Sequence, residues 1–185
     1  MIEIRSLTEL PSEALSQDDT RYTSTEKYVA HKTEDSQRTV ISLELTPLDA
    51  PYIKQYPSKD DEEMQRYQQY AREGHSLGAY DGDTLVGLAL TEARWWNRTL
   101  WLWEFYVAAT HRRQGIGLQL MKALAEKARQ AGFRVITLET QNTNVPAIAF
   151  YRSAGFEIES IDLSFYTNHD VIDGEVAIFM KRKLG

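Results

Sequence analysis

A glycine pair behind two arginines is the part of this chain whose residue types could most directly do chemistry. The six residues are Arg112-Arg113-Gln114-Gly115-Ile116-Gly117, and they join an apolar stretch to an amphipathic one. Glycine lets a ligand approach the backbone, and the free N–H groups at the start of a helix bind anions. The arginines add positive charge at the rim. The pattern predicts a diphosphate site; the alternative is a tight strand-to-helix turn that holds no ligand.

Two widespread phosphate-binding motifs do not fit these residues. A Rossmann dinucleotide site has a third glycine three residues after the second, and this chain has Leu120 there. A P-loop has lysine and then serine or threonine after its last glycine, whereas Gly117 is followed by Leu118 and Gln119. A diphosphate would therefore be held by another arrangement.

The segments on either side of the turn predict a strand–helix–strand crossover. Leu100 to Val107 is apolar on both faces except at Glu104, so we expect a central strand covered on both sides. Gly115 to Ala131 has the period of an amphipathic helix, and Arg134 to Thr140 reads as a second buried strand. The apolar residues of this helix expected on one side are Leu118, Leu120, Met121, Leu124 and Ala128. A mixed α/β fold follows.

The rest of the chain supplies the other predicted elements. Strands are expected at Glu26–His31, Thr39–Leu45, Ser76–Tyr80, Thr84–Ala93, Phe156–Asp162 and Glu175–Lys181. Helices are expected at Ser58–Glu73, closed by Gly74, and at Asn144–Ala154. Turns are expected at Lys32–Arg38, Asp81–Asp83 and Trp95–Arg98, and Pro47, Pro51 and Pro57 mark a connecting segment.

Length and composition narrow the class of protein. The 185 residues suit a single domain, and the absence of cysteine excludes disulfides and a cysteine nucleophile and fits a reducing compartment. A formal net charge of −6 argues against a nucleic-acid partner and favours a cationic or neutral small molecule. We see neither a signal peptide nor a run of about 20 apolar residues. We expect a cytoplasmic protein with no membrane partner.

Two signatures around this crossover resemble the GNAT superfamily of N-acetyltransferases. Val107 through Gly117 resembles the family's Arg/Gln-x-x-Gly-x-Gly/Ala motif after a strand. The second signature, an Asn-initiated helix that ends in Phe-Tyr-x-x-x-Gly-Phe, matches Asn144 through Phe156. The resemblance covers about Gly78 to Ile161. It implies a mostly antiparallel central sheet flanked by helices, an acetyl-CoA-binding core at 76–182 and an acceptor-side part at 1–57.

The resemblance also implies which residues bind acetyl-CoA. The pantetheine arm would pair with the backbone of Tyr106, Val107 and Ala108, and the pyrophosphate would rest on the amides of Arg112 to Gly117. Asn144 matches the residue that hydrogen-bonds the arm of CoA. Its alternative role is a helix N-cap ahead of Val145 and Pro146, and both roles are compatible.

Two catalytic residues are expected. Tyr151 matches the tyrosine that protonates the leaving thiolate; its alternative is a half-buried core residue. Glu104 could deprotonate the acceptor ammonium, and burial would raise its pKa. The alternative for Glu104 is a strand-end acid paired with Arg94, Arg98 or another cation. No metal-ligand spacing joins His31, His75, His111 and His169, and no Gly-x-Ser-x-Gly elbow occurs. Direct attack of an amine on the thioester is expected, with neither acyl-enzyme nor metal.

Five segments after about Leu45 carry a closer resemblance: Leu48–Tyr56, Asp60–Glu63, Trp96–Arg98, Leu138–Gln141 and Phe165–Tyr166. Together they resemble the streptothricin acetyltransferases, and this resemblance indicates the acceptor. Those enzymes acetylate an amine of the β-lysine part of a cationic antibiotic, which confers resistance. Expected contacts to such a cation are Trp96, Glu104, Glu139 and Tyr166, together with the acidic run Asp60–Glu63. Helix-start acids facing water and aromatic packing explain the same residues without a ligand.

Other functions stay open. The acceptor could instead be a polyamine, an aminoglycoside or a protein amine, or the chain could be a non-enzymatic acyl-CoA-binding regulatory domain. A homodimer is possible.

Overall fold

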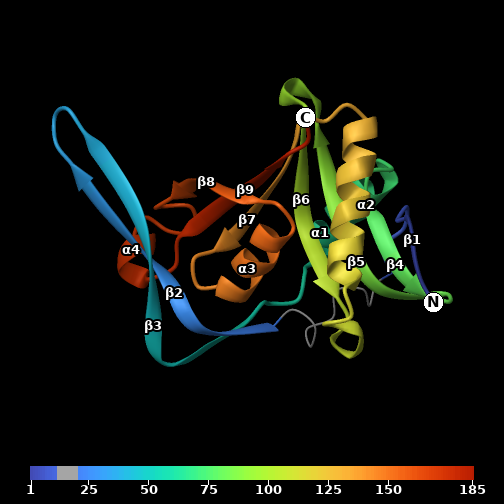
Figure 1. Cartoon of the computed structure of the whole chain (residues 1–185), viewed down its shortest axis with the longest axis horizontal. Coiled ribbons are helices and arrows are strands. Elements are labelled where there is room, and N and C mark those ends of the chain that lie inside the picture. Colours follow the sequence, from blue (N-terminus) through green and yellow to red (C-terminus); the bar gives the residue numbers. More distant parts are fainter. Residues whose placement is uncertain (12–20) are drawn as a thin grey trace. The chain divides into compact units, whose positions relative to one another are not determined.

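The computed structural model describes residues 1–11 and 21–185, which form two compact units (Figure 1). The first unit contains Met1–Arg21, Gln55–Leu138 and Lys181–Gly185. The second contains Tyr22–Lys54 and Glu139–Met180. The single-domain expectation stays a prediction, and its acceptor-side part includes residues 12–20, which lie outside the described residues.

The first unit is built on a mostly antiparallel sheet. Its strands are ordered β1 (Ile2–Ser6), β4 (Leu77–Asp81), β5 (Thr84–Arg94), β6 (Thr99–Val107) and the first half of β7 (Val135–Gln141). Neighbours are antiparallel except for β6 and β7, which run parallel with Thr99 opposite Val135 and Leu102 opposite Leu138. The predicted central crossover and hairpin are confirmed. The edge strand β1 was not predicted.

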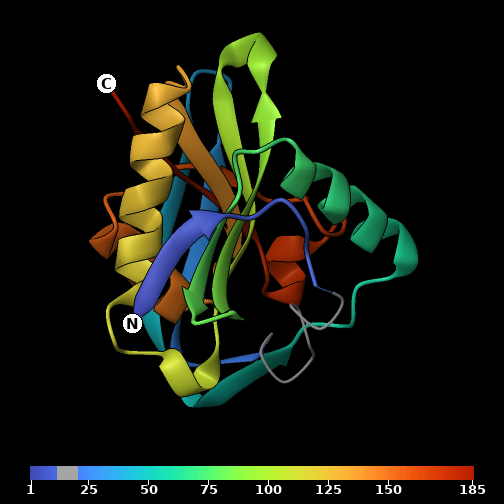
Figure 2. The same ribbon diagram turned by 90° about the vertical axis from the view of Figure 1, so that its right-hand side faces the viewer.

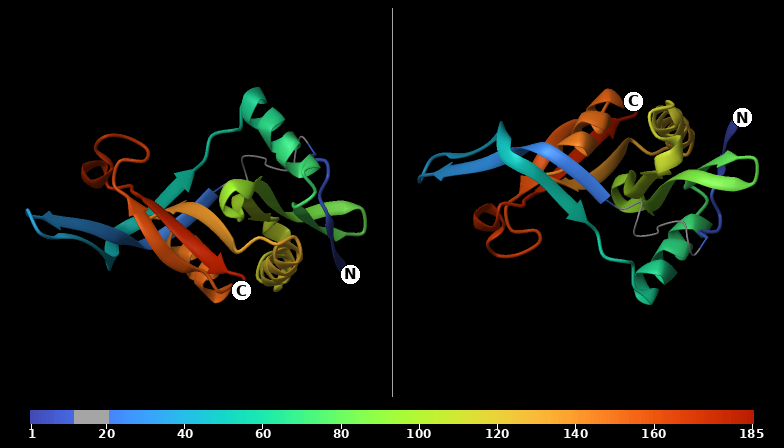
Figure 3. Two further views of the ribbon diagram at one scale, coloured as in Figure 1. Left: turned by 90° about the horizontal axis from the view of Figure 1, so that it is seen from above. Right: turned by 90° about the horizontal axis from the view of Figure 1, so that it is seen from below.

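Two helices cover opposite faces of this sheet (Figures 2 and 3). α2 (Ile116–Gln130) makes the crossover from β6 to β7, and its buried residues are Ile116, Leu120, Met121, Leu124, Ala125 and Ala128. The prediction for Leu118 is wrong, because this side chain is 47% exposed. On the other face, Tyr67 and Ala71 of α1 (Asp61–Arg72) pack with Leu88 and Leu90.

The start of α1 lies later than predicted. Asp60, not Ser58, is the N-cap, and its carboxylate accepts the Glu63 N–H at 2.8 Å while Glu63 reaches back to the Asp60 N–H. This capping box satisfies two helix-end donors and places acids beside the positive end of the helix dipole. The acidic run therefore has a structural role. Gly74, at φ +82, follows the helix as predicted.

A β-bulge interrupts β6 beside Glu104. Leu90 of β5 lies opposite Glu104 and Thr91 lies opposite Leu102, so Trp103 is an extra residue on β6. A bulge bends its strand and re-aims the neighbouring side chains. The expectation that the strand is covered on both sides fails here, because Trp103 is 40% exposed and Glu104 is half-buried.

The second unit contains a long hairpin of β2 (Arg21–Glu34) and β3 (Thr39–Gln55). Both strands extend beyond the predicted ends, and β3 runs through Pro47 and Pro51, so a connecting segment there is wrong. β3 pairs only with β2 within this two-stranded sheet. An edge strand tolerates proline where the missing N–H would point away from the neighbouring strand. Pro47 and Pro51 are four residues apart, so their backbone groups lie on the same edge of β3.

The other elements of the second unit are close to their predicted positions. The second half of β7 is followed in sheet order by β9 (Ala177–Lys183) and β8 (Glu157–Asp162). α3 (Val145–Ser153) lies where the second signature predicts a helix, and α4 (Asp170–Asp173) is an additional short turn. Among the residues that the structure describes, no helix is both long and apolar enough to cross a membrane.

Candidate active site

The glycine turn has the backbone geometry of an anion site. Gly115 is the N-cap of α2 at φ +79, and Arg113 also has a left-handed backbone at φ +61. The first helical hydrogen bond of α2 runs from the Gln119 N–H to the Gly115 carbonyl at 3.0 Å. The amides of Ile116, Gly117 and Leu118 precede it, in the first turn of the helix. Such first-turn amides, with the helix dipole, attract anions. A left-handed non-glycine residue costs about 1–2 kcal/mol, so the turn holds Arg113 in a strained backbone conformation.

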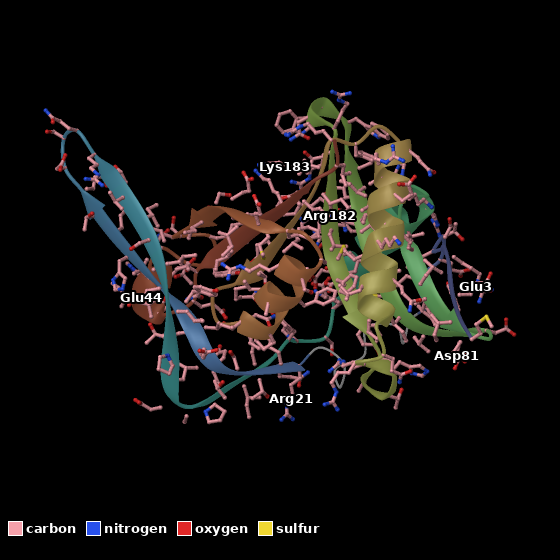
Figure 4. All side chains as sticks on the ribbon, in the orientation of Figure 1. Glu3, Arg21, Glu44, Asp81, Arg182 and Lys183 are labelled. Carbon is pink, nitrogen blue, oxygen red and sulfur yellow. The ribbon has the colours of Figure 1, made fainter. Side chains whose placement is uncertain are left out.

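Side chains of the turn fasten it to the end of β6. Arg112 Nε donates to the Val107 carbonyl at 2.8 Å, and Gln114 Nε2 donates to the Thr110 carbonyl at 3.2 Å. His111 Nε2 lies 3.7 Å from a carboxylate oxygen of Asp81, which is labelled at the end of β4 in Figure 4. These contacts fix the turn before any ligand arrives, so little entropy is lost on binding.

The end of β6 has part of its backbone already engaged. The Ala108 N–H donates to the Val86 carbonyl at 2.8 Å, and the Ala108 carbonyl accepts from the His111 N–H at 2.8 Å. Both backbone groups of Ala108 are thus engaged, and the Val107 carbonyl already accepts from Arg112. The predicted pantetheine contacts to Tyr106 and Val107 stay predictions. Gly87 of β5 lies beside these two residues: a Cβ there would meet Tyr106 O at 3.0 Å and Val107 Cγ2 at 3.4 Å. Glycine at 87 thus permits the close approach of the two strands.

Glu104 lies in a polar cluster that sequence reasoning missed. Its Oε1 is 2.8 Å from Lys59 Nζ and accepts the Tyr67 hydroxyl at 2.7 Å. The alternative of an ion pair is therefore confirmed, although its partner is neither Arg94 nor Arg98. Burial, and then the charge of Glu104, raises the pKa of Tyr67, so this hydroxyl remains a donor.

Trp96 is not brought to Glu104. It belongs to a 3₁₀ turn, Trp95–Asn97, at the start of β6, whereas the glycine turn follows the end of that strand. The Trp96 side chain is 86% exposed. The tryptophan next to Glu104 is Trp103, whose ring stacks on Tyr70 with 6.0 Å between centroids. The β-bulge sets Trp103 beside Glu104, and the sequence carries no clear signal for a bulge at this position.

In the second unit, Asn144 and Tyr151 lie at the two ends of α3. Asn144 Oδ1 accepts the Ala147 N–H at 3.2 Å, so its N-cap role is confirmed. The cap occupies the oxygen and leaves the amide nitrogen as a donor, so a CoA contact stays compatible. Tyr151 is half-buried, with ring centroids 5.4 Å from Phe150 and 5.7 Å from Phe156. Its packing matches the structural alternative, and its acid role stays a prediction.

Glu139 and Tyr166 do come together in the second unit. The Tyr166 hydroxyl donates to Glu139, and Lys54 Nζ lies 5.9 Å from the Tyr166 ring centroid. Burial raises the pKa of the Glu139 carboxyl, against the smaller lowering effects of Tyr166 and Lys54. Burial and the Glu139 charge likewise raise the pKa of Tyr166. A carboxyl held in this way favours a cationic neighbour.

Further residues around this pair were missed by sequence reasoning. Lys54 Nζ is 2.5 Å from Glu175 Oε2, and the Thr143 hydroxyl donates to Glu175 Oε1 at 3.1 Å. The Tyr22 and Thr143 hydroxyls are 2.7 Å apart. We call Glu139, Tyr166, Glu175 and Lys54 the second-unit cluster. Lys54 lay in the segment taken for a connection, so its place near the end of a strand could not be anticipated.

Comparison with known proteins gives consistent matches. Residues 43–156 match the model of the Acetyltransferase (GNAT) family. A streptothricin acetyltransferase of Streptomyces lavendulae is 32% identical over 182 residues, which cover 96% of this chain and 93% of the relative. Streptothricin acetyltransferase A of Bacillus subtilis (strain 168) is 29% identical, covering 70% of this chain and 72% of the relative.

Two solved structures show the same fold. A crystal structure of nourseothricin acetyltransferase matches with a TM-score of 0.77 and 28% identity, covering 100% of this chain and 99% of the other. A Bacillus subtilis acetyltransferase in complex with CoA matches with a TM-score of 0.56 and 21% identity, covering 68% and 86% of the two chains.

Proposed function

This chain belongs to the acetyltransferase (GNAT) family, and we propose that it acetylates a primary amine of streptothricin, on the β-lysine moiety, and so confers resistance. It is an N-acetyltransferase with acetyl-CoA as co-substrate. The observation that carries the choice of acceptor is the likeness to a streptothricin acetyltransferase over 96% of this chain. The acceptor is then a cationic small molecule, in keeping with the net charge of −6.

The glycine turn fits the pyrophosphate of acetyl-CoA. The left-handed Gly115 and Arg113 shape the turn, the first amides of α2 supply donors, and Arg112 and Arg113 supply positive charge. We propose that Tyr106 and Val107 pair with the pantetheine arm and that the Asn144 amide nitrogen donates to it. Acetyl-CoA supplies an activated acyl group as a thioester. The chain's own residues orient it and move protons.

Two residues are proposed to move those protons. Glu104 takes a proton from the acceptor ammonium, directly or through water, because a free amine is the nucleophile that attacks a thioester. Tyr151 gives its hydroxyl proton to the departing sulfur. We further propose that Glu139 and Tyr166 bind a cationic group of the acceptor, supported by the hydrogen bond that holds the Glu139 carboxylate and by the second carboxylate of the cluster, Glu175. A contact from Trp96 stays a prediction.

The direct test is a mass-shift assay with acetyl-CoA and a panel of amines that contains streptothricin, a polyamine and an aminoglycoside. We expect streptothricin to gain one acetyl group at the highest kcat/KM of the panel. Turnover of another amine without streptothricin would reject the proposed acceptor. Acetyl-CoA binding without turnover of any amine would favour a regulatory acyl-CoA-binding domain.

Location and assembly are also proposed. A chain without cysteine fits the cytoplasm, where thiols are kept reduced. A homodimer would appear as a doubled mass in light scattering of the purified protein.

A further inference from the structure

The carboxylate of Glu104 already holds an ammonium group of the chain itself. Lys59 Nζ lies 2.8 Å from Oε1, and the Tyr67 hydroxyl donates to the same oxygen at 2.7 Å. The bulge at Trp103 precedes Glu104 directly. A base for an acceptor ammonium would need this same carboxylate, so acceptor and Lys59 compete for one position.

We propose that Lys59 is an internal occupant of the acceptor-ammonium position, that the acceptor displaces it, and that Tyr67 is a positioning residue which holds Glu104 during the exchange. The inference rests on the proposed role of Glu104 as the base. One ammonium leaves as another arrives, so the carboxylate keeps one cationic partner throughout.

Lys59 has a second carboxylate within reach. Glu63 Oε1 lies 3.9 Å from Lys59 Nζ, and Glu63 is anchored in the capping box at the start of α1. Lys59 lies just before this helix, and a lysine side chain has four flexible bonds. Moving from Glu104 to Glu63 therefore leaves Lys59 with a partner. The nearby Tyr67 ring, 5.3 Å from Nζ, provides a face for the cation on the way.

Tyr67, in contrast, is built to stay. Its side chain is 5% exposed and packs in a buried cluster with Leu88, Leu90 and Ala71. Burial raises the pKa of its hydroxyl, which therefore keeps its proton. A fixed donor and an exchangeable ammonium on one oxygen are what a reusable ammonium position needs.

The decisive variant is Lys59→Met, which removes the charge and keeps much of the side-chain length. Because the acceptor no longer has to displace an ammonium from Glu104, and a partly exposed ion pair is weak, we expect the acceptor KM to fall about two- to fivefold. The acetyl-CoA KM should stay at the wild-type value. Lys59→Arg should keep the wild-type acceptor KM. Lys32→Met removes an exposed ion pair with Glu34 on the hairpin and is the control for loss of one positive charge.

Tyr67→Phe tests the positioning role. It keeps the buried ring, so we expect the thermal midpoint to change little while kcat falls about tenfold and the acetyl-CoA KM stays constant. An unchanged or raised acceptor KM in Lys59→Met would overturn the exchange, and a wild-type kcat in Tyr67→Phe would overturn the positioning role. If the wild type turns over another amine and not streptothricin, the proposed acceptor fails. The variants are then assayed with that amine, so the two failures are distinguished.

Discussion

Two carboxylates of this chain, one in each unit, lie against a tyrosine hydroxyl and near a lysine. Glu104 accepts from Tyr67 and pairs directly with Lys59. Glu139 accepts from Tyr166, but the nearby Lys54 pairs with Glu175 instead. In the first cluster the proposed base is itself paired with the ammonium, and Glu63 lies 3.9 Å from the same lysine nitrogen. In the second, the ammonium pairs with Glu175 and not with the carboxylate that accepts from Tyr166. Glu139 therefore suits the retention of a cation that enters beside it, whereas Glu104 suits the exchange of one and its deprotonation.

Glu104→Gln is the variant expected to separate the two roles most strongly. The amide keeps an acceptor oxygen for Tyr67 but cannot take a proton. We expect kcat to fall about 10²- to 10⁴-fold, the usual contribution of a general base. Steady-state kinetics with both substrates measures it, and the affinity for acetyl-CoA should not change. A kcat within threefold of wild type would show that the base lies elsewhere.

Gly117→Leu tests whether acetyl-CoA is held by the glycine turn, which lies apart from both carboxylates in the sequence. Gly117 lies in the first turn of α2, so a side chain there would block the approach of a phosphate to the backbone. Because several hydrogen bonds to a charged group would be lost, we expect CoA affinity to fall about 100-fold or more in titration calorimetry. Gly117→Ala, which the family motif allows, is the matched control. Unchanged affinity in the leucine variant would reject the pyrophosphate assignment.

Glu139→Gln should change binding rather than turnover. The variant removes the carboxylate that the acceptor cation would meet, while Lys54 keeps its ion pair with Glu175. We expect the acceptor KM to rise about tenfold, equivalent to ~1.4 kcal/mol, with kcat within twofold of wild type. If Glu139→Gln lowered kcat as much as Glu104→Gln does, the assigned difference between the clusters would be wrong.

The parts of this fold that could be predicted are those with local signals. The glycine turn, the apolar period of α2 and the Asp-Gly hairpin each depend on neighbouring residues, so the crossover and the tight turn that starts α2 follow from them. Asn144 likewise lies directly before the helix that it caps. A short-range rule suffices wherever the partners are a few residues apart.

The polar partners of the carboxylates could not be predicted in this way. Tyr67 and Lys59 are 37 and 45 residues from Glu104 along the chain, and their meeting depends on how α1 packs across the sheet. Proline also misled the reading of β3, because its cost depends on whether the missing N–H faces a partner strand or the outside. That orientation is a property of the assembled sheet.

The smallest expected effect concerns stability and the titration of Glu139. Burial raises the pKa of folded Glu139 above the unfolded value of 4.5. Between these two values the folded state binds more protons than the unfolded state, so this group lowers stability as pH rises through the folded pKa. Glu139→Gln removes the titration. The thermal midpoint of Glu139→Gln minus that of the wild type should therefore increase as pH rises from 4 to 7. A constant difference over that range would contradict the raised pKa.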